Sequence, residues 1–204
     1  RINEFNYGVR FTLADGQREV TKYPNESGDI NTWYAGKLDG TIWGYTTVGI
    51  AQTQEEMDAH LANNKPNWGS KWGAGDVMYA DLNGDGEVTS GSSTLGDHGD
   101  LTVIGNSYAR YNFGLTLDGS WKGLDFSVFL QGVMKRDYWL SGPYFWGASG
   151  DEWQSACFTE HLDYWTPDNP DAYYPKPYFG GITKNQQVQT GYLQNAAYLR
   201  VKNV

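Results

Sequence analysis

Three segments of the chain alternate strictly between apolar and polar residues, and this pattern constrains the fold more than any other feature. In residues 6–13, apolar side chains occupy every second position, at Tyr7, Val9, Phe11 and Leu13. Residues 110–117 and 124–131 repeat the pattern, and a fourth candidate begins near residue 196. Because successive side chains of a strand point to opposite faces, each segment predicts a β-strand with one apolar face.

The composition agrees with a protein made of strands and turns. The chain contains fifteen Tyr, nine Trp, eight Phe and 26 Gly but only three Met. Aromatic residues favour strands, and glycine favours turns. No run approaches the roughly 20 apolar residues that a membrane-spanning helix needs. We therefore expect an all-β fold.

The connections between the predicted strands differ greatly in length. Residues 118–123 read as a short hairpin turn, whereas residues 15–107 and 136–195 form two very long connections. Alternating strands joined by short turns on one side and long loops on the other are typical of outer-membrane barrels. The pattern predicts part of an antiparallel transmembrane β-barrel, with about four strands. These strands would cover residues 6–14, 108–117, 124–134 and 196 onward, and the long connections would be extracellular loops.

One short helix is expected within the first long connection. Thr53 and Glu56 form a capping box, in which the Thr side chain accepts from the Glu56 backbone and the Glu side chain reaches back. Met57, His60 and Leu61 follow at helical spacing. This predicts a surface helix over residues 53–63.

The net charge bears on which partners the chain can bind, and its two ends bear on whether it is a piece of a longer protein. A net charge of −9 argues against nucleic acid, because phosphate binding needs clustered Lys and Arg. The sequence begins at Arg1 without a signal segment and ends within a strand-like run. We expect it to be a piece of a longer protein.

The sharpest local motif lies in residues 81–100. Side-chain oxygens stand at loop positions one, three and five, followed by Gly86 at six and a backbone carbonyl at seven, the spacing of a calcium loop. Ser92 replaces the usual last acidic ligand, so Asp97 or Asp100 would have to complete the shell. A metal-free Asx turn is the alternative. The motif predicts a structural calcium site with the ligands Asp81, Asn83, Asp85, Glu87 and Asp100.

The second long connection, residues 136–195, is rich in aromatic residues. Such rings stack on sugars, but they also pack Gly-rich loops, and for any single ring packing is the more common role. We take Trp146, Trp153, Tyr164 and Trp165 as candidate substrate-binding residues. The sequence contains no zinc spacing, nucleophile elbow, phosphate loop or dinucleotide fingerprint, so we predict no catalytic residues and no enzyme.

Six strings, in this order, resemble one family. They are residues 40–50 (GTIWGYTTVGI), 75–86 (GDVMYADLNGDG), 100–107 (DLTVIGNS), 121–125 (WKGLD), 129–133 (FLQGV) and 198–203 (YLRVKN). Together they resemble the SusC/RagA family of TonB-dependent outer-membrane transporters of Bacteroidetes. The resemblance covers about residues 30 to 204.

The resemblance implies a barrel of about 22 strands with an N-terminal plug. It also implies import of glycans or peptides in the outer membrane, with a SusD-like lipoprotein as lid and with TonB as the energy-coupling partner. Residues 1–204 would then be part of the barrel of a TonB-dependent receptor, in contact with the lipid bilayer. The plug and the TonB box are absent from this sequence.

Two other interpretations remain open from the sequence. A secreted, calcium-stabilised carbohydrate-binding β domain would use the same metal loop and aromatic residues without a barrel. A glycoside hydrolase fragment is the third, but sequence cannot give the carboxyl separation that such an enzyme needs. The binding module would bury its apolar strand faces in a closed core, whereas the barrel would leave them facing lipid.

Overall fold

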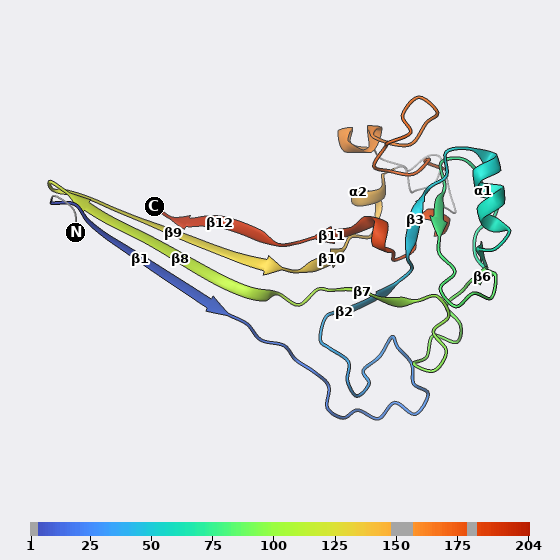
Figure 1. The fold of residues 1–204 in the computed structure, drawn as a ribbon, viewed down its shortest axis with the longest axis horizontal. Helices are drawn as coiled ribbons and strands as arrows, with labels where there is room; N and C mark the ends of the chain where they lie inside the picture. Colours follow the sequence, from blue (N-terminus) through green and yellow to red (C-terminus); the bar gives the residue numbers. More distant parts are fainter. Residues whose placement is uncertain (1–3, 148–156, 179–182) are drawn as a thin grey trace.

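The computed structural model describes residues 4–147, 157–178 and 183–204. Its main element is a four-stranded antiparallel sheet in the order β1-β8-β9-β12. The strands are β1 (Asn6–Ala14), β8 (Arg110–Trp121), β9 (Leu124–Lys135) and β12 (Tyr198–Asn203). All four predicted strands are present, and the all-β, antiparallel class is confirmed. In Figure 1 these strands extend as a long ribbon from a compact body formed by the two long connections.

The hairpin between β8 and β9 is tighter than predicted. The predicted turn began at residue 118, but β8 continues to Trp121, which pairs with Leu124. Only Lys122 and Gly123 form the turn, and both have positive φ, +48° and +84°. Two positive φ values define the type I′ turn, whose twist matches that of the flanking strands. The prediction was too long because a Lys-Gly pair is a weaker turn signal than Asn-Gly.

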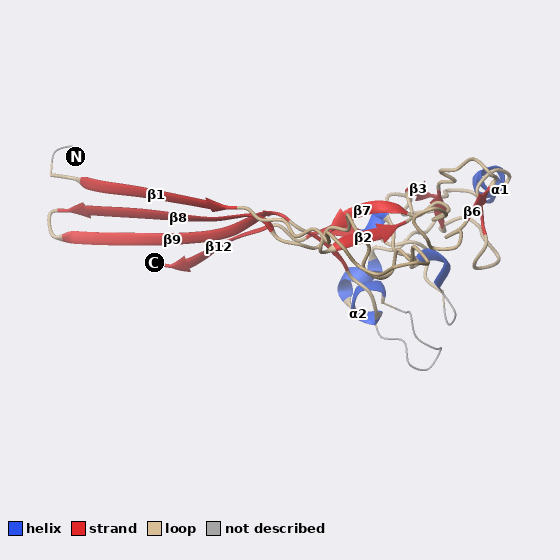
Figure 2. Cartoon of the chain, turned by 90° about the horizontal axis from the view of Figure 1, so that it is seen from below, coloured by secondary structure: helices blue, strands red, loops and turns tan. Residues whose placement is uncertain are grey.

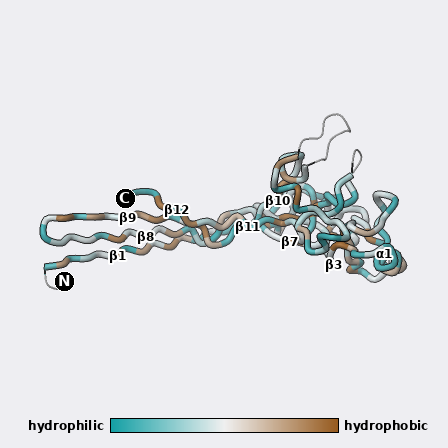
Figure 3. Tube along the Cα trace, turned by 90° about the horizontal axis from the view of Figure 1, so that it is seen from above, coloured by the Kyte–Doolittle hydropathy of each residue, from teal (hydrophilic) through white to brown (hydrophobic). Residues whose placement is uncertain are grey.

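The register gathers most of the apolar side chains of the four strands on one face of the sheet. Directly opposed residues share a face, and Val9 lies opposite Leu117, which lies opposite Val128. The apolar face carries Tyr7, Val9, Phe11 and Leu13 of β1, Phe113, Leu115, Leu117 and Trp121 of β8, Leu124, Phe126, Val128 and Leu130 of β9, and Leu199 and Val201 of β12. Figure 3 shows the hydropathy alternating along these strands.

The opposite face is mostly polar. It carries Arg10 and Thr12 of β1, Asn112, Thr116, Asp118 and Ser120 of β8, Asp125, Ser127 and Gln131 of β9, and Arg200 of β12. Phe129, Val133 and Tyr198 are exceptions on this face, and the ring of Phe129 lies against Gly114 of the neighbouring strand. No second layer covers the sheet within the described residues (Figure 2), so Val9 is 64% exposed. β1 and β12 each have one neighbour, which leaves this sheet open at both edges.

The two long connections fold into one body, called here the cap, at one end of the sheet. The first contributes the pairs β2 (Thr41–Gly44) with β7 (Thr102–Asn106), β3 (Thr47–Ile50) with β5 (Val77–Tyr79), and β4 (Lys65–Pro66) with β6 (Glu87–Val88). The second contributes β10 (Asp137–Trp139) with β11 (Leu193–Asn195).

The predicted helix is confirmed as α1 (Gln54–Leu61). Thr53 accepts from the Glu56 backbone at 3.1 Å, as expected, but the Glu56 carboxylate accepts from the Gln52 backbone, one residue before the cap. A second helix, α2 (Pro143–Trp146), and three 3-10 turns at Thr159–Leu162, Thr183–Asn185 and Thr190–Tyr192 were not predicted. None of the described helices has the length and apolar character needed to span a membrane.

Candidate functional site

An aromatic core joins the two long connections inside the cap. Tyr45, Val77, Tyr79 and Val88 come from the first connection, and Trp146 and Tyr192 come from the second. Rings meet mostly edge to face, as in the Trp146 and Tyr192 pair with centroids 4.8 Å apart. The two connections therefore share one apolar core, although most of the sheet separates them in sequence.

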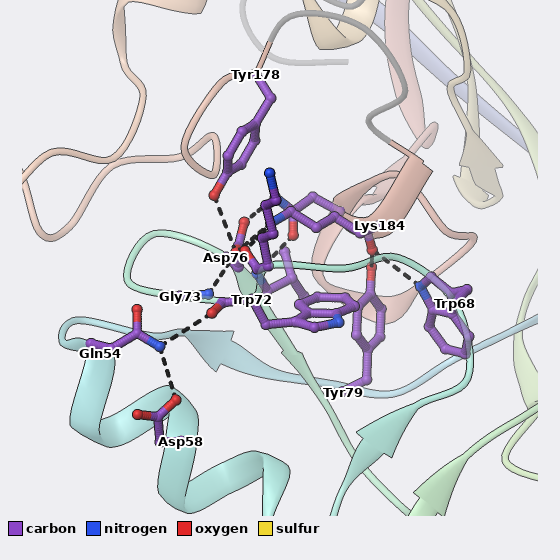
Figure 4. Close-up of polar contacts among 12 residues, drawn as sticks. Gln54, Asp58, Trp68, Trp72, Gly73, Asp76, Tyr79, Tyr178 and Lys184 are labelled. Atoms are coloured by element: carbon purple, nitrogen blue, oxygen red, sulfur yellow. Dashed lines mark hydrogen bonds and ion pairs between the residues drawn. The ribbon is translucent and has the colours of Figure 1, made fainter.

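A buried ion pair fixes the same junction. Lys184 of the second connection donates from Nζ to Asp76 of the first at 2.7 Å, and Asp76 is fully buried. The Asp76 carboxylate also accepts from the Asn185 amide at 2.8 Å and from the backbone N–H of Gly73 at 2.8 Å. A buried charge is stable only when it is paired and hydrogen-bonded. Figure 4 shows this network, which we call the clamp.

Tyr178 completes the clamp. Its hydroxyl donates to Asp76 at 3.2 Å, and its ring lies 4.1 Å from Lys184 Nζ. Burial, together with the negative charge of Asp76, raises the pKa of Tyr178 above its usual value. The phenol therefore stays protonated and keeps its role as a donor. Lys184 Nζ lies between the Asp76 carboxylate and the face of the Tyr178 ring, both of which attract a cation.

A second set of polar contacts lies beside the clamp. Tyr79 donates from its hydroxyl to the Lys184 carbonyl at 2.8 Å, and Gln189 donates to the Tyr79 oxygen at 3.1 Å. The Gln189 amide oxygen in turn accepts from the Thr47 hydroxyl at 2.8 Å. Burial raises the pKa of Tyr79 well above its usual value. The buried polar groups of Tyr79 and Gln189 are thus partnered across the junction of the two connections.

A hollow lies on the surface of this junction. It has a volume of about 550 Å³ and is lined by Gln54 and residues 71–74 of the first connection and by residues 164–167 and 176–178 of the second. We call it the inter-loop groove. A second hollow, of about 340 Å³, lies between Trp146, His161, Tyr164 and Tyr178 within the second connection. Tyr164 lines both hollows.

The four predicted substrate-binding aromatics have different surroundings. Trp146 is buried in the cap core, and Trp165 is buried with its indole N–H donating to Gln52 at 2.8 Å. Tyr164 is half-buried and exposes part of its ring to the hollows. Trp153 lies outside the described residues. The rings of Trp146 and Trp165 are thus mostly covered by neighbouring residues. Among the described members, Tyr164 is the best placed to contact a ligand.

The Asp-rich loop forms the turn that its sequence favours. Asp81 accepts from the backbone N–H groups of Gly84 at 2.6 Å and Gly86 at 2.7 Å. Asp85 accepts from the Glu87 backbone at 2.8 Å, and Asn83 accepts from the Asp85 backbone at 2.9 Å. The hydrogen bond from Gly86 is the main cause that lowers the pKa of Asp81. The carboxylate is therefore ionised at neutral pH.

Asp100 returns to this loop, as the predicted shell requires. Its carboxylate accepts from the backbone of Leu82 at 2.6 Å and of Thr89 at 2.7 Å. The Asp100 backbone N–H donates to the Thr89 carbonyl at 2.8 Å. Residues 90–99 therefore form a loop that is closed by this hydrogen bond. Asp97 instead accepts from Ser92, within this loop of residues 90–99. Of the two candidates that could complete the shell, only Asp100 lies against the loop.

The side-chain oxygens of this loop are of the type that binds a hard cation, but they already accept hydrogen bonds from backbone N–H groups. A carboxylate has about four lone-pair sites, so an oxygen that accepts one N–H retains acceptor capacity. However, the described residues contain no group of three or more Asp, Glu, His or Cys side chains that could hold a metal ion. The turn is thus stable through its own hydrogen bonds, which is the arrangement expected of the metal-free alternative as well.

Sequence reasoning missed the clamp. Asp76 and Lys184 are separated by 108 positions, and neither lies in a periodic segment. The available signal was weak: Asp76 stands between Gly75 and the apolar run at Val77, a place where a charged side chain is unusual. Finding its partner requires the tertiary fold.

Comparison with known proteins gives a consistent result. No family model matches the chain. TonB-dependent receptor P26 of Formosa agariphila is 27% identical over 164 residues, which are 79% of this chain and 14% of the receptor. A solved structure, described as the RagAB peptide transporter, superposes with a TM-score of 0.59 at 20% identity over 99% of this chain and 20% of that chain. The chain therefore spans less than a quarter of the length of either protein.

The sequence match is to a TonB-dependent receptor. The structural likeness shows that it shares the fold of the part of the transporter that it covers. The sequence-based resemblance agrees with the match to a TonB-dependent receptor at this broader level. The two proteins are described as a receptor and a transporter rather than as enzymes, which fits the prediction that the chain is not an enzyme.

Proposed function

We propose that this chain is part of the barrel wall and of the external loops of a SusC/RagA-type TonB-dependent transporter in the outer membrane. The observation that carries the proposal is the four-stranded sheet, with its continuous apolar face and no covering layer in the described part of the chain. In water such a face would favour aggregation. In a bilayer it would face the lipid, while the polar face would line the lumen.

The dimensions of the sheet support this placement. A transmembrane strand needs about 9 to 11 residues when tilted by about 45°. β8 and β9 each have 12 residues, and β1 has 9. The open edges at β1 and β12 would pair with further strands of a full-length barrel, because unsatisfied backbone groups are costly in lipid.

The connections define the proposed orientation. Barrels of this kind keep short turns on the periplasmic side and long loops outside. The Lys122–Gly123 turn would therefore face the periplasm, and the cap, built from residues 15–107 and 136–195, would lie on the cell exterior. The cap would form part of the substrate vestibule and a seat for a SusD-like lipoprotein. TonB would act through regions outside this sequence.

The proposed cargo is a glycan or a peptide. The structural relative is described as a peptide transporter, and the half-buried rings at the hollows suit a sugar as well. Tyr164, together with Trp146, Trp153 and Trp165, is the proposed substrate-binding set. Because Trp146 and Trp165 are buried, we assign the direct contact to Tyr164 among the described members.

We also propose that the Asp-rich loop binds a structural calcium ion. Asp81, Asn83, Asp85 and the Glu87 carbonyl would be ligands, and Asp100 would complete or support the shell. On the cell exterior, millimolar calcium can keep even a weak site filled. Adding a chelator to the purified full-length protein should lower hydrogen-exchange protection of residues 81–100, and calcium should restore it. Unchanged protection under chelator would contradict the calcium site and leave the metal-free turn.

A secreted carbohydrate-binding module is the alternative, and the open apolar face argues against it, since a soluble domain would cover that face. The direct test is fractionation of cells that express the full-length protein. We expect it in the outer-membrane fraction, resistant to extraction by carbonate at high pH. Recovery as a soluble protein in the periplasm or the medium would contradict the transporter assignment.

A further inference from the structure

The inter-loop groove contains positive charge that the fold does not neutralise. Lys71 and Lys176 line it, and both are exposed. Where residues are described, the ion pairs involve Arg18, Arg110 and Lys184 but neither of these two lysines. Asp76, beneath the groove, is already paired with Lys184. In a chain with a net charge of −9, this is a local positive site.

The remaining lining is aromatic and polar rather than aliphatic. Trp72, Tyr164 and Tyr178 are each half-buried and expose part of their rings. The groove contains no Leu, Ile, Val, Met or Phe among its lining residues. A pocket for the apolar side chains of a peptide would use such residues, whereas flat rings with a few charged groups suit a polar, ring-shaped ligand.

The walls of the groove are held in place by the clamp. Lys184 donates to the carbonyl of Lys71 at 3.0 Å, and Asp76 accepts from the backbone of Gly73 on the same wall. On the other wall, Tyr178 donates to Asp76, and the Lys176 backbone donates to the Gly75 carbonyl at 2.8 Å. The groove is thus organised before a ligand arrives, which lowers the entropic cost of binding.

We propose that the inter-loop groove binds an acidic saccharide, with sugar rings against Trp72 and Tyr164 and a carboxylate or sulfate group at Lys71 and Lys176. The proposal rests on the assignment of the cap to a substrate vestibule, and it specifies in addition that the substrate is negatively charged. Lysine suits this role because it binds an anion as a point charge without demanding a planar partner.

Binding by purified full-length protein in detergent tests the proposal. The probes are an oligogalacturonide and its methyl-esterified form, and a sulfated dextran oligosaccharide and its unsulfated form. We expect the charged member of at least one pair to bind more tightly, with an affinity that falls as salt rises. The pair that shows the difference identifies carboxylate or sulfate as the preferred group.

Variants localise the effect. Lys71→Gln and Lys176→Gln should each weaken binding of the acidic probe by about two- to fivefold, the range of an exposed ion pair, and the double variant should bind as weakly as the neutral probe. Lys65→Gln makes the same charge change at an exposed position outside the groove and should leave affinity unchanged.

Three results would overturn the proposal: no binding of any probe, equal affinity for charged and neutral probes, or unchanged affinity in the double variant. Tighter binding of an acidic peptide, such as oligoglutamate, would also overturn it in favour of a peptide ligand. Each result leaves the transporter assignment standing, because outer-membrane fractionation of the same protein tests that assignment independently.

Discussion

The ring of Phe126 on β9 covers Gly119, the directly opposed residue on β8, so closely that a Cβ at position 119 would collide with the ring. The opposed pair of Phe113 and Gly132 repeats the arrangement farther along the same two strands. An aromatic ring placed over a glycine restores the packing that the missing side chain would have provided. The apolar face is therefore continuous although glycines interrupt two of its rows.

This pairing predicts coupled effects of substitution. Phe126→Ala should lower the free energy of unfolding of the full-length protein in lipid vesicles by about 0.2 to 1 kcal/mol, the range for a cross-strand pair. Gly119→Ala should also destabilise, because the ring must move. The double variant should lose less than the sum of the two, as urea unfolding can measure. Simple additivity would show that the pair does not interact in the membrane.

The two faces of the sheet should respond differently to charge. Leu115 and Thr116 are neighbours near the middle of β8, on the apolar and the polar face respectively. Leu115→Arg should destabilise the full-length protein by about 2 to 4 kcal/mol, whereas Thr116→Arg should have a much smaller effect. The yield of assembled protein in outer membranes measures both. Equal yields would contradict the assignment of the faces.

Removing the charge of Lys184 should loosen the cap. Lys184→Met leaves the buried Asp76 carboxylate without its cation, which typically costs about 3 to 5 kcal/mol. We expect hydrogen-exchange protection to fall in β5 and in residues 183–192, with little change in β8 and β9. Adding Asp76→Asn should recover part of the loss, because no charge is then buried. Lys65→Met, at an exposed position, is the control.

The cap should lose stability in mild acid through His60. This side chain donates from Nε2 to the Tyr79 carbonyl at 2.8 Å, and burial lowers the pKa of His60, although the Tyr79 carbonyl and Glu56 oppose the shift. The unfolded chain, with a pKa near 6.5, therefore binds the proton more readily. Stability is complete above about pH 6.5 and falls as the pH drops through the folded pKa. Hydrogen-exchange protection of α1 measures this dependence, and His60→Gln should flatten it. If protection of α1 depended on pH to the same extent in that variant, His60 would be excluded as the cause of the pH dependence.

The sheet was predictable from sequence because strand alternation is a local property. Tyr7 to Leu13 and Leu124 to Leu130 identify their faces without any knowledge of their neighbours. The hairpin was recognisable as well, but its turn was placed too early, and the register, with Leu117 opposite Val128, required the structure. The capping role of Thr53 was equally local.

The interior of the cap was not predictable in the same way. Asp76 and Lys184 meet only because two connections fold against each other, and no periodic pattern marks either residue. The aromatic residues were recognisable as a group, but packing decided that Trp146 and Trp165 are buried while Tyr164 stays accessible. The motif indicated that Asp97 or Asp100 would have to return to the loop, whereas the choice of Asp100 and the closure at Thr89 required the structure.

The orientation of the chain across the outer membrane tests the account most directly. In the full-length protein with Cys157→Ser, which removes the exposed cysteine, Asp168→Cys places a thiol in the cap and Lys122→Cys places one in the hairpin turn. Both positions are exposed. A maleimide too large to cross the outer membrane should label Asp168→Cys on intact cells and should label Lys122→Cys only after the membrane is permeabilised. Labelling of Lys122→Cys on intact cells, with Asp168→Cys protected, would contradict the topology and the function proposed from it.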